Sequence, residues 1–131
     1  MWLSKLSETQ RLALLRLAHN VVVSDGLLDP NEEGMLDYLR ANMGLHDVQE
    51  IEYLELDGIS TIFDSRQSRI VALLNLLKVS YADGAFEIEE ECLLKELGKT
   101  FQVSDNEFLL LDNWVKRLIS LEGEALALME P

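Results

Sequence analysis

The chain has few of the residues that would cross-link it or interrupt its helices. Its 131 residues include one cysteine, Cys92, and two prolines. A single cysteine excludes an internal disulfide framework, and apolar neighbours predict that the Cys92 thiol is buried. Because prolines are so few, helices can run without interruption. A chain of this length can bury one hydrophobic core, so the sequence predicts a single domain over residues 1–131.

The sequence also lacks a long apolar run. Its first residues, MWLSKLSETQ, carry charges before any apolar segment develops, so no secretory signal is predicted. No apolar run approaches the roughly 18 residues that a membrane span requires. We therefore expect a cytoplasmic protein that meets a membrane only peripherally, if at all.

Basic residues are scarce. The chain holds 11 Lys and Arg against 24 Asp and Glu, which gives a formal net charge of −13. This field repels phosphate backbones, so we expect no nucleic-acid partner. Most of the charge serves solubility, and it also attracts cations and basic protein partners.

What the sequence has in abundance is helical periodicity. Apolar residues recur at three- and four-residue spacing, and strand-like alternation is rare. The pattern predicts an all-α class, a compact bundle of about six to seven helices. Two capping boxes, Ser7 with Gln10 and Ser104 with Glu107, mark helix starts. The expected helices cover residues 7–24, 30–43, 47–56, 65–82, 88–101 and 104–121, with a turn at 59–63 and a last turn in the tail.

Two short acidic motifs stand between these helices. SDGLLDPNE at 24–32 and ADGAFEIEE at 82–90 share the pattern D-G-x5-E, and they lie 58 residues apart. The same offset relates Arg11 to Arg69 and Leu39 to Leu97, among other pairs. We interpret this as an internal duplication, with repeats at about 11–50 and 69–108 that pack as two halves of one domain.

The acidic residues of each motif fall on apolar helix faces. Asp25 and Asp83 continue the apolar line of the preceding helix, and Glu32 and Glu90 lie on the line of the following one. In an antiparallel hairpin these ends meet, so each aspartate is expected to face its glutamate. Facing carboxylates repel each other, and burial strengthens the repulsion. A bound divalent cation would remove it, with Asp29 and Glu87 as further ligands.

Helix capping is an alternative explanation that the sequence leaves open. Glu32 and Glu90 fall at the third helical position, where a glutamate can bond back to the cap, and Asp29 is an ordinary N-cap. The turns do not match an EF-hand, because glycine follows the first aspartate directly. On either explanation the neighbouring Glu33, Glu89 and Glu91 point to solvent, and Glu91 lies four residues before Lys95, in the favourable order for an ion pair.

With two acidic turns of the form (A/S)-D-G-x5-E between helices, best seen in VSYADGAFEIEEECLL, the chain resembles the TerB-like family of tellurite-resistance proteins. The resemblance covers roughly residues 12–121. It implies a compact helical bundle, acidic residues associated with divalent-metal binding, and a part in stress-response or membrane-associated assemblies without known catalysis. The family motif falls on Asp25, Gly26, Glu32, Asp83, Gly84 and Glu90.

No arrangement of nucleophile and base, zinc-ligand spacing or phosphate loop is present. Paired carboxylates could serve acid–base hydrolysis, but a small bundle without aromatic cleft residues suits that chemistry poorly. The sequence therefore predicts a non-enzymatic domain, acting in a stress-response or scaffold assembly, that binds calcium, magnesium or manganese. The predicted metal ligands are Asp25, Asp29, Glu32, Asp83, Glu87 and Glu90. The alternative is a metal-free interaction module, whose apolar groove receives a helix of a protein partner.

Overall fold

Helices are the regular secondary structure of the part of the chain that the structure describes. The computed structural model describes residues 1–23, 30–48, 51–81 and 88–130, without the side chains of residues 31 and 32. Within these ranges it has six α-helices, one 3-10 turn and no strand, so the predicted all-α class is confirmed. In chain order the elements are η1 (Leu3–Lys5), α1 (Glu8–Val22), α2 (Pro30–Asn42), α3 (Ile59–Ile62), α4 (Arg66–Ser80), α5 (Ile88–Thr100) and α6 (Asp105–Met129).

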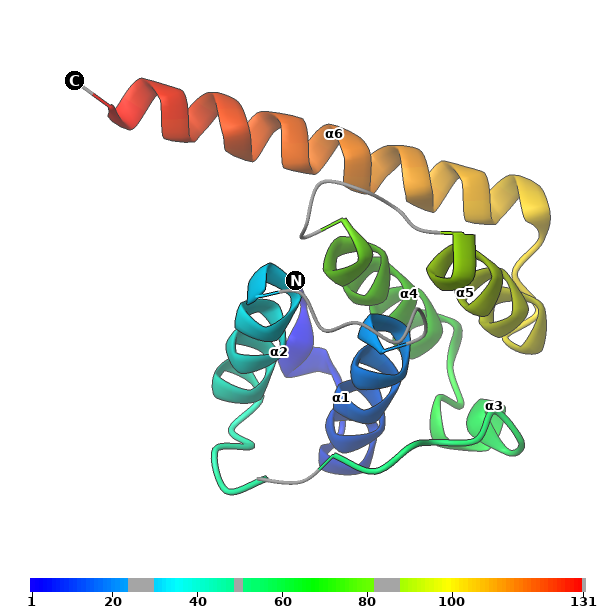
Figure 1. Cartoon of the computed structure of the whole chain (residues 1–131). Coiled ribbons are helices and arrows are strands. Elements are labelled where there is room, and N and C mark those ends of the chain that lie inside the picture. The colour runs from blue at the N-terminus through cyan, green and yellow to red at the C-terminus, as the bar shows by residue number, and fades with distance from the viewer. Residues whose placement is uncertain (24–29, 49–50, 82–87, 131) are drawn as a thin grey trace.

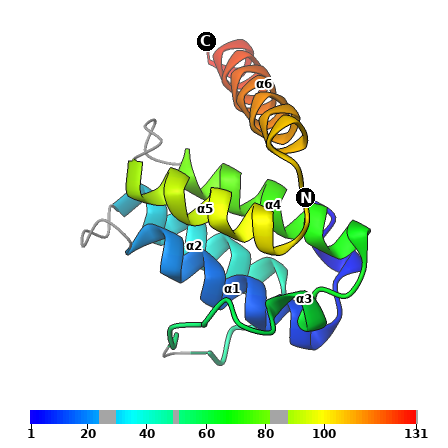
Figure 2. The ribbon, with the colours of Figure 1, turned by 90° about the vertical axis from the view of Figure 1, so that its right-hand side faces the viewer.

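The centre of the bundle is formed by α1 and α4 (Figure 1). Every residue from Val71 to Leu77 is buried, and a helix that is apolar on all sides belongs inside a core. Both α2 and α5 pack against α1 and α4, and α6 crosses over α4 and α5. This arrangement brings the ends of α1 and α4 to the same side of the bundle as the starts of α2 and α5 (Figure 2).

Helix starts follow the predicted capping chemistry. The Ser7 hydroxyl accepts a hydrogen bond from the Gln10 amide at 3.2 Å, and the Ser104 hydroxyl accepts one from the Glu107 amide at 3.1 Å. In both boxes the side chain of the later residue accepts from the serine amide. Both predicted capping boxes are confirmed, because each serine satisfies amides that have no partner within the helix.

The helix pair α4 and α5 matches the pair α1 and α2 in its bounds. α4 and α5 begin and end 58 residues after α1 and α2. Ser7 and Ser65 are the N-caps of α1 and α4, each within a capping box. Behind α2 and α5 the chain turns through the left-handed region at Gly44, with φ 71°, and at Gln102, with φ 61°. That conformation ends a helix, and a residue with a side chain adopts it at some cost.

The predicted helix over residues 47–56 is wrong. Residues 51–55 are irregular, and side chains of α1 bind their backbone. Arg16 donates to the carbonyl oxygens of Glu52, at 3.1 Å, and Tyr53, at 2.8 Å. The buried Asn20 amide donates to the Leu54 carbonyl at 2.8 Å and accepts from the Leu54 amide at 3.4 Å. These long-range hydrogen bonds replace the helical ones and override the local propensity.

The last helix is longer than predicted. It was expected to end near Leu121 with one further turn in the tail, but α6 runs without a break to Met129. The good helix formers of residues 125–128, ALAL, outweigh the cost of Gly123. Even so, none of the helices in the described ranges combines the length and the apolar character that a membrane span needs.

The predicted burial of Cys92 is also wrong, because its side chain is exposed. The buried line of α5 contains Leu94, Leu97 and Phe101. At about 100° of rotation per residue, Cys92 lies well away from this line, on the solvent side of the helix. The apolar residues next to Cys92 in the sequence therefore did not predict on which side of the helix it lies.

Candidate functional site

Most of the predicted metal ligands lie outside the part of the chain that the structure describes. This holds for Asp25, Asp29, Asp83 and Glu87, whereas Glu32 belongs to α2 but its side chain is not among those described. Among the described residues, no group of three or more His, Cys, Asp and Glu side chains is placed to hold a metal. The metal site therefore stays a prediction, and Glu90 is the ligand candidate whose surroundings can be examined.

Glu90 is a buried carboxylate in the first turn of α5. Its exposed fraction is 1%, comparable with 0% for Leu94 and 2% for both Leu97 and Phe101 on the same helix line. The expected position of Glu90 on the apolar line is thus confirmed. Burial of a carboxylate is unfavourable unless positive charge or hydrogen-bond donors compensate it. The surroundings of Glu90 must therefore supply one or the other.

The apolar lines that precede the two motifs are buried up to the helix ends. On α1 the line of Leu14, Ala18 and Val21 is at most 2% exposed. On α4 the equivalent line of Ala72, Leu76 and Val79 is fully buried. Each line leads from the core toward the motif that follows it, since α1 ends three residues before Asp25 and α4 three residues before Asp83.

The glutamates next to the predicted ligands behave as expected of a solvated face. Glu33 and Glu89 are exposed, in contrast to the adjacent Glu90. Glu91 is half-buried, and one of its carboxylate oxygens lies 2.8 Å from the Lys95 ammonium nitrogen. The predicted ion pair is confirmed. On α5 the buried carboxylate of Glu90 thus contrasts with the exposed Glu89 and the surface pair of Glu91 and Lys95.

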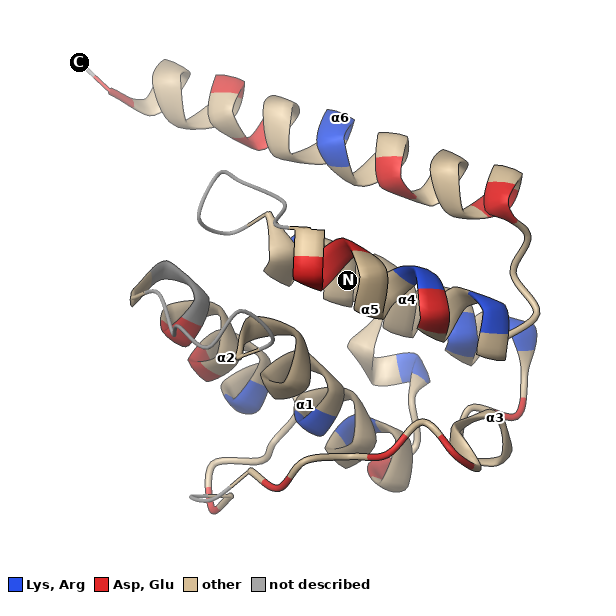
Figure 3. Cartoon of the chain, turned by 45° about the vertical axis from the view of Figure 1, so that its right-hand side comes forward, with Lys and Arg blue, Asp and Glu red and all other residues tan. Residues whose placement is uncertain are grey.

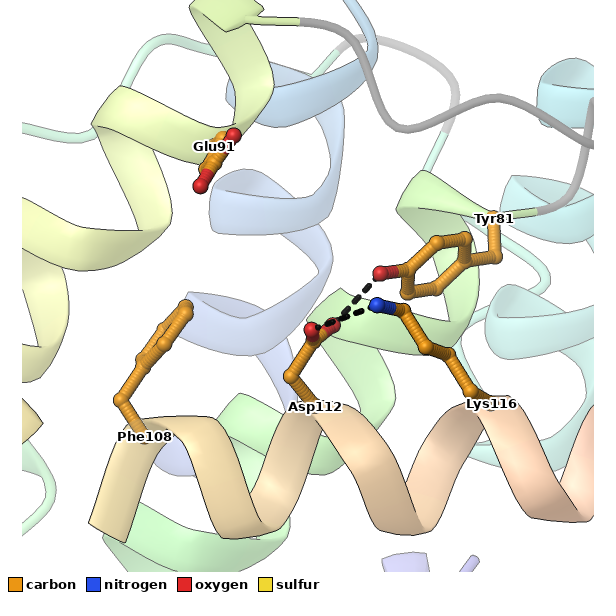
Figure 4. A pocket seen from close by; sticks show the side chains of 5 residues that line it. All are labelled: Tyr81, Glu91, Phe108, Asp112 and Lys116. Carbon is orange, nitrogen blue, oxygen red and sulfur yellow. Dashed lines mark hydrogen bonds and ion pairs between the residues drawn. The ribbon is translucent and has the colours of Figure 1, made fainter. Parts of the chain in front are cut away.

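A polar cluster from α4 and α6 lies beside the second motif. The Tyr81 hydroxyl donates to Asp112 at 2.6 Å, and the Lys116 ammonium lies 3.2 Å from the other oxygen of that carboxylate. These side chains converge in Figure 4, where Glu91 and Phe108 complete the lining of a cavity of about 180 Å³. The cluster thus joins Tyr81, at the C-terminal end of α4, to α6.

Burial raises the pKa of the Tyr81 phenol well above its ordinary range. The hydrogen bond to Asp112 acts in the same direction, and so do the negative charges of Asp112 and Glu91, because each disfavours the phenolate. Tyr81 therefore stays protonated at neutral pH and serves as a hydrogen-bond donor to the Asp112 carboxylate.

Sequence reasoning missed this cluster. The four-residue spacing of Asp112 and Lys116 is a recognisable ion-pair signal on a helix. Nothing in the pattern indicates that Tyr81 meets them, because that contact depends on how α6 crosses α4. At the 58-residue offset, Val23 corresponds to Tyr81, so a phenol at this position is particular to the second motif.

Comparison of the chain with protein-family models, with curated proteins and with solved structures finds no significant match.

Proposed function

We propose that the chain is a non-enzymatic, TerB-like domain that binds a divalent cation at its two acidic turns. The observation that carries this proposal is the burial of Glu90, at 1% exposure, on the apolar line that begins next to the second motif. A cation held between Asp83 and Glu90 would compensate the buried charge with carboxylate oxygens, which calcium, magnesium and manganese all accept.

Internal duplication extends the proposal to the first turn. The matching bounds of the helix pairs and the paired capping serines, Ser7 and Ser65, favour two equivalent halves. Gly44 and Gln102 add a stronger indication, because the same unusual backbone conformation recurs at the same offset although the residue differs. In this interpretation Asp25 and Glu32 do in the first half what Asp83 and Glu90 do in the second, and Asp29 and Glu87 are secondary ligands.

We further propose that the domain acts in the cytoplasm, within a stress-response or scaffold assembly, through a protein partner. The support for this is the family resemblance of the two motifs and the net charge of −13, which suits a basic partner. Figure 3 shows where the acidic and basic residues lie along the described helices. Cation binding at the turns would fix the ends of the four main helices relative to one another. A surface built on those ends would then respond to the metal.

The alternative is a metal-free interaction module, and the burial of Glu90 also suits it. A glutamate at the third position of a helix can accept hydrogen bonds from backbone amides at the helix start, which compensate its charge without a metal. The two functions differ in a measurable way, because capping stabilises the fold at any metal concentration.

The decisive experiment is a titration with calcium, magnesium and manganese, followed by calorimetry and by the melting temperature. A cation site predicts binding heat and a melting temperature that rises with metal; a ligand at 100 times its Kd adds about 2.7 kcal/mol to the free energy of unfolding. The double variant Asp83→Asn/Glu90→Gln should lose most of this response.

The matched control is Glu89→Gln/Glu96→Gln, which removes two charges from exposed positions of the same helix. It should keep the metal response. If the wild type binds none of the three metals at millimolar concentration while Asp83→Asn/Glu90→Gln lowers its stability, the capping function is correct and the metal site is rejected.

A further inference from the structure

The C-terminal end of α6 is largely uncovered: Glu122 pairs with Lys78 of α4 at 3.0 Å, but the large apolar side chains of this end are exposed. All residues from 120 to 130 are exposed, whereas Phe108 and Val115 in the first half of the helix are buried. The helix has 25 residues, which corresponds to a length of about 37 Å. Figure 2 shows its C-terminal end as the part of α6 farthest from the other helices. We call residues 118–130 the α6 tail.

A line of apolar side chains runs along α6 into this tail at alternating three- and four-residue spacing. We call it the α6 seam; it consists of Leu111, Trp114, Leu118, Leu121, Ala125 and Leu128. Its first three residues are half-buried and its last three are exposed, with Leu121 at 61% and Leu128 at 87%. This spacing is the heptad repeat by which two helices pair along a seam.

An apolar groove lies beside the start of the seam. The ring centroid of Trp2 is 5.8 Å from that of Trp114, so η1 and the seam are neighbours. Trp2, Ile70 and Leu74 are apolar residues of a groove of about 340 Å³ whose basic residues are Lys5 and Arg66. We call it the Trp2 groove. It is long enough on α4, two helical turns from Arg66 to Leu74, to take part of a second helix.

The charges of the tail and of this surface are complementary. The α6 tail contains Glu122, Glu124 and Glu130 and no basic residue, and both basic residues of α6 precede it, at positions 116 and 117. In Figure 3 the blue segment of α6 accordingly lies before its C-terminal half. Within the chain Glu122 already pairs with Lys78, and Arg66 of the groove with Glu107 of α6. The charges offered to a second copy are therefore mainly Glu124 and Glu130 on the tail and Lys5 in the groove.

We propose that two copies of this chain pair along the α6 seam in antiparallel orientation, each tail lying in the Trp2 groove of the other copy. Such a contact is isologous, so each tail-to-groove contact is made twice. Antiparallel pairing sets Leu118 against Leu121 of the other copy, and Leu128 against Leu111. Arg117 and Glu124, one heptad apart on the same edge of the seam, then face each other between the copies.

Parallel pairing would instead place two acidic tails side by side, which like-charge repulsion disfavours. A membrane is a poorer occupant of the seam, because the tail glutamates and the net charge of −13 repel anionic lipid. The proposal is independent of the cation site, since it uses neither of the acidic motifs. All tests of it can be done in the presence of a chelator.

Sedimentation equilibrium over micromolar to millimolar chain concentration tests the pairing. The wild type should be a dimer at the upper end, and Leu121→Gln should weaken dimerisation by about tenfold or more, because a leucine buried at the seam is lost. Leu126→Gln is the matched control, with the same substitution at 62% exposure on another face of the tail. It should leave the dimer unchanged, and circular dichroism should show the same helix content in all three proteins.

Charge reversal tests the orientation. Arg117→Glu and Glu124→Arg should each weaken the dimer, and the double variant should restore it, because the pair is re-formed with opposite signs. A wild type that stays monomeric up to millimolar concentration overturns the proposal. So does equal weakening by Leu121→Gln and Leu126→Gln, or a monomer that sediments with phospholipid vesicles through the tail.

Discussion

At the scale of single residues, Tyr81 makes stability depend on pH in a defined direction. Its phenol is held protonated by burial and by the Asp112 carboxylate, which accepts its hydrogen bond at 2.6 Å. The pKa of Tyr81 is therefore higher in the folded chain than in the unfolded one, where an ordinary tyrosine titrates near 10. As pH rises through that range, the unfolded state loses its proton first. The stabilisation is complete below about pH 10 and is lost progressively above it.

We accordingly expect the free energy of unfolding to fall between about pH 9.5 and 11, and Tyr81→Phe to make that fall shallower. Urea unfolding at several pH values measures it. Tyr53→Phe is the control, because Tyr53 is 60% exposed and should leave the slope unchanged. An identical slope in wild type and Tyr81→Phe would contradict the prediction.

Residue-level features could be predicted where they follow from helix geometry. The Glu91–Lys95 pair, the exposure of Glu89 and the burial of Glu90 all follow from the position of each residue around α5. The burial of Cys92 was predicted wrongly, because its apolar neighbours in sequence were weighed and its angle around the helix was not. The contact of Tyr81 with α6 could not be predicted, because helix periodicity does not specify how two helices cross.

At the scale of helices, two glycines in helix interiors should respond to different extents to the same substitution to alanine. Gly34 lies in α2, is exposed, and has open space where a Cβ would stand. Gly98 lies in α5, is buried, and a Cβ there would come within 3.3 Å of the Phe108 ring of α6. Alanine favours a helix over glycine by roughly 0.5–1 kcal/mol, so Gly34→Ala should raise the melting temperature by about 3–5 °C.

At Gly98 the same gain is opposed by the close approach of α5 and α6. Gly98→Ala should therefore stabilise less than Gly34→Ala, and Gly98→Val should destabilise by about 1–3 kcal/mol, because its larger side chain overpacks the contact with Phe108. Thermal unfolding by circular dichroism measures all three variants. Equal stabilisation by both alanine variants would show that Phe108 moves without cost.

Helices were predictable where local signals act alone. The starts of α1 and α6 were predicted from Ser7 and Ser104, because a capping box lies within four residues. Residues 47–56 also have a helical pattern, but Arg16 and Asn20 take the hydrogen bonds of this segment from 36 and 34 residues away. The end of α6 was placed near Leu121, but the helix formers after Gly123 carry the helix to Met129.

At the scale of the whole molecule, the all-α fold class could be predicted from the sequence, whereas the metal site stays a prediction. Periodicity and low proline content are properties of the entire sequence, and they determine an all-helical bundle whatever the crossing angles are. The interpretation of an internal duplication likewise rests on an offset that is visible in the sequence. The metal site depends instead on whether Asp25 meets Glu32 and Asp83 meets Glu90, and those side chains, apart from Glu90, lie outside the described residues. The metal site is therefore tested by titration with metal ions.

The net charge of −13 leads to a last prediction at this scale. A compact chain brings its negative charges together, so self-repulsion destabilises the folded state relative to the expanded one. Raising NaCl from about 0.01 M to 0.5 M shortens the Debye length from roughly 30 Å to less than 10 Å and screens this repulsion. Salt also weakens surface ion pairs such as Glu91–Lys95, but each contributes at most about 1 kcal/mol.

We therefore expect the melting temperature to rise by several degrees with NaCl, at a fixed chain concentration and in the presence of a chelator. Glu89→Gln/Glu96→Gln, which lowers the net negative charge by two, should melt higher than the wild type at low salt and approach it at high salt. If the two melting temperatures converge at high salt, NaCl acts by general screening and not by binding of an ion. The reason is that salt which screens the self-repulsion also removes the effect of any single surface charge. A melting temperature that falls with NaCl would mean that the ion pairs outweigh the self-repulsion.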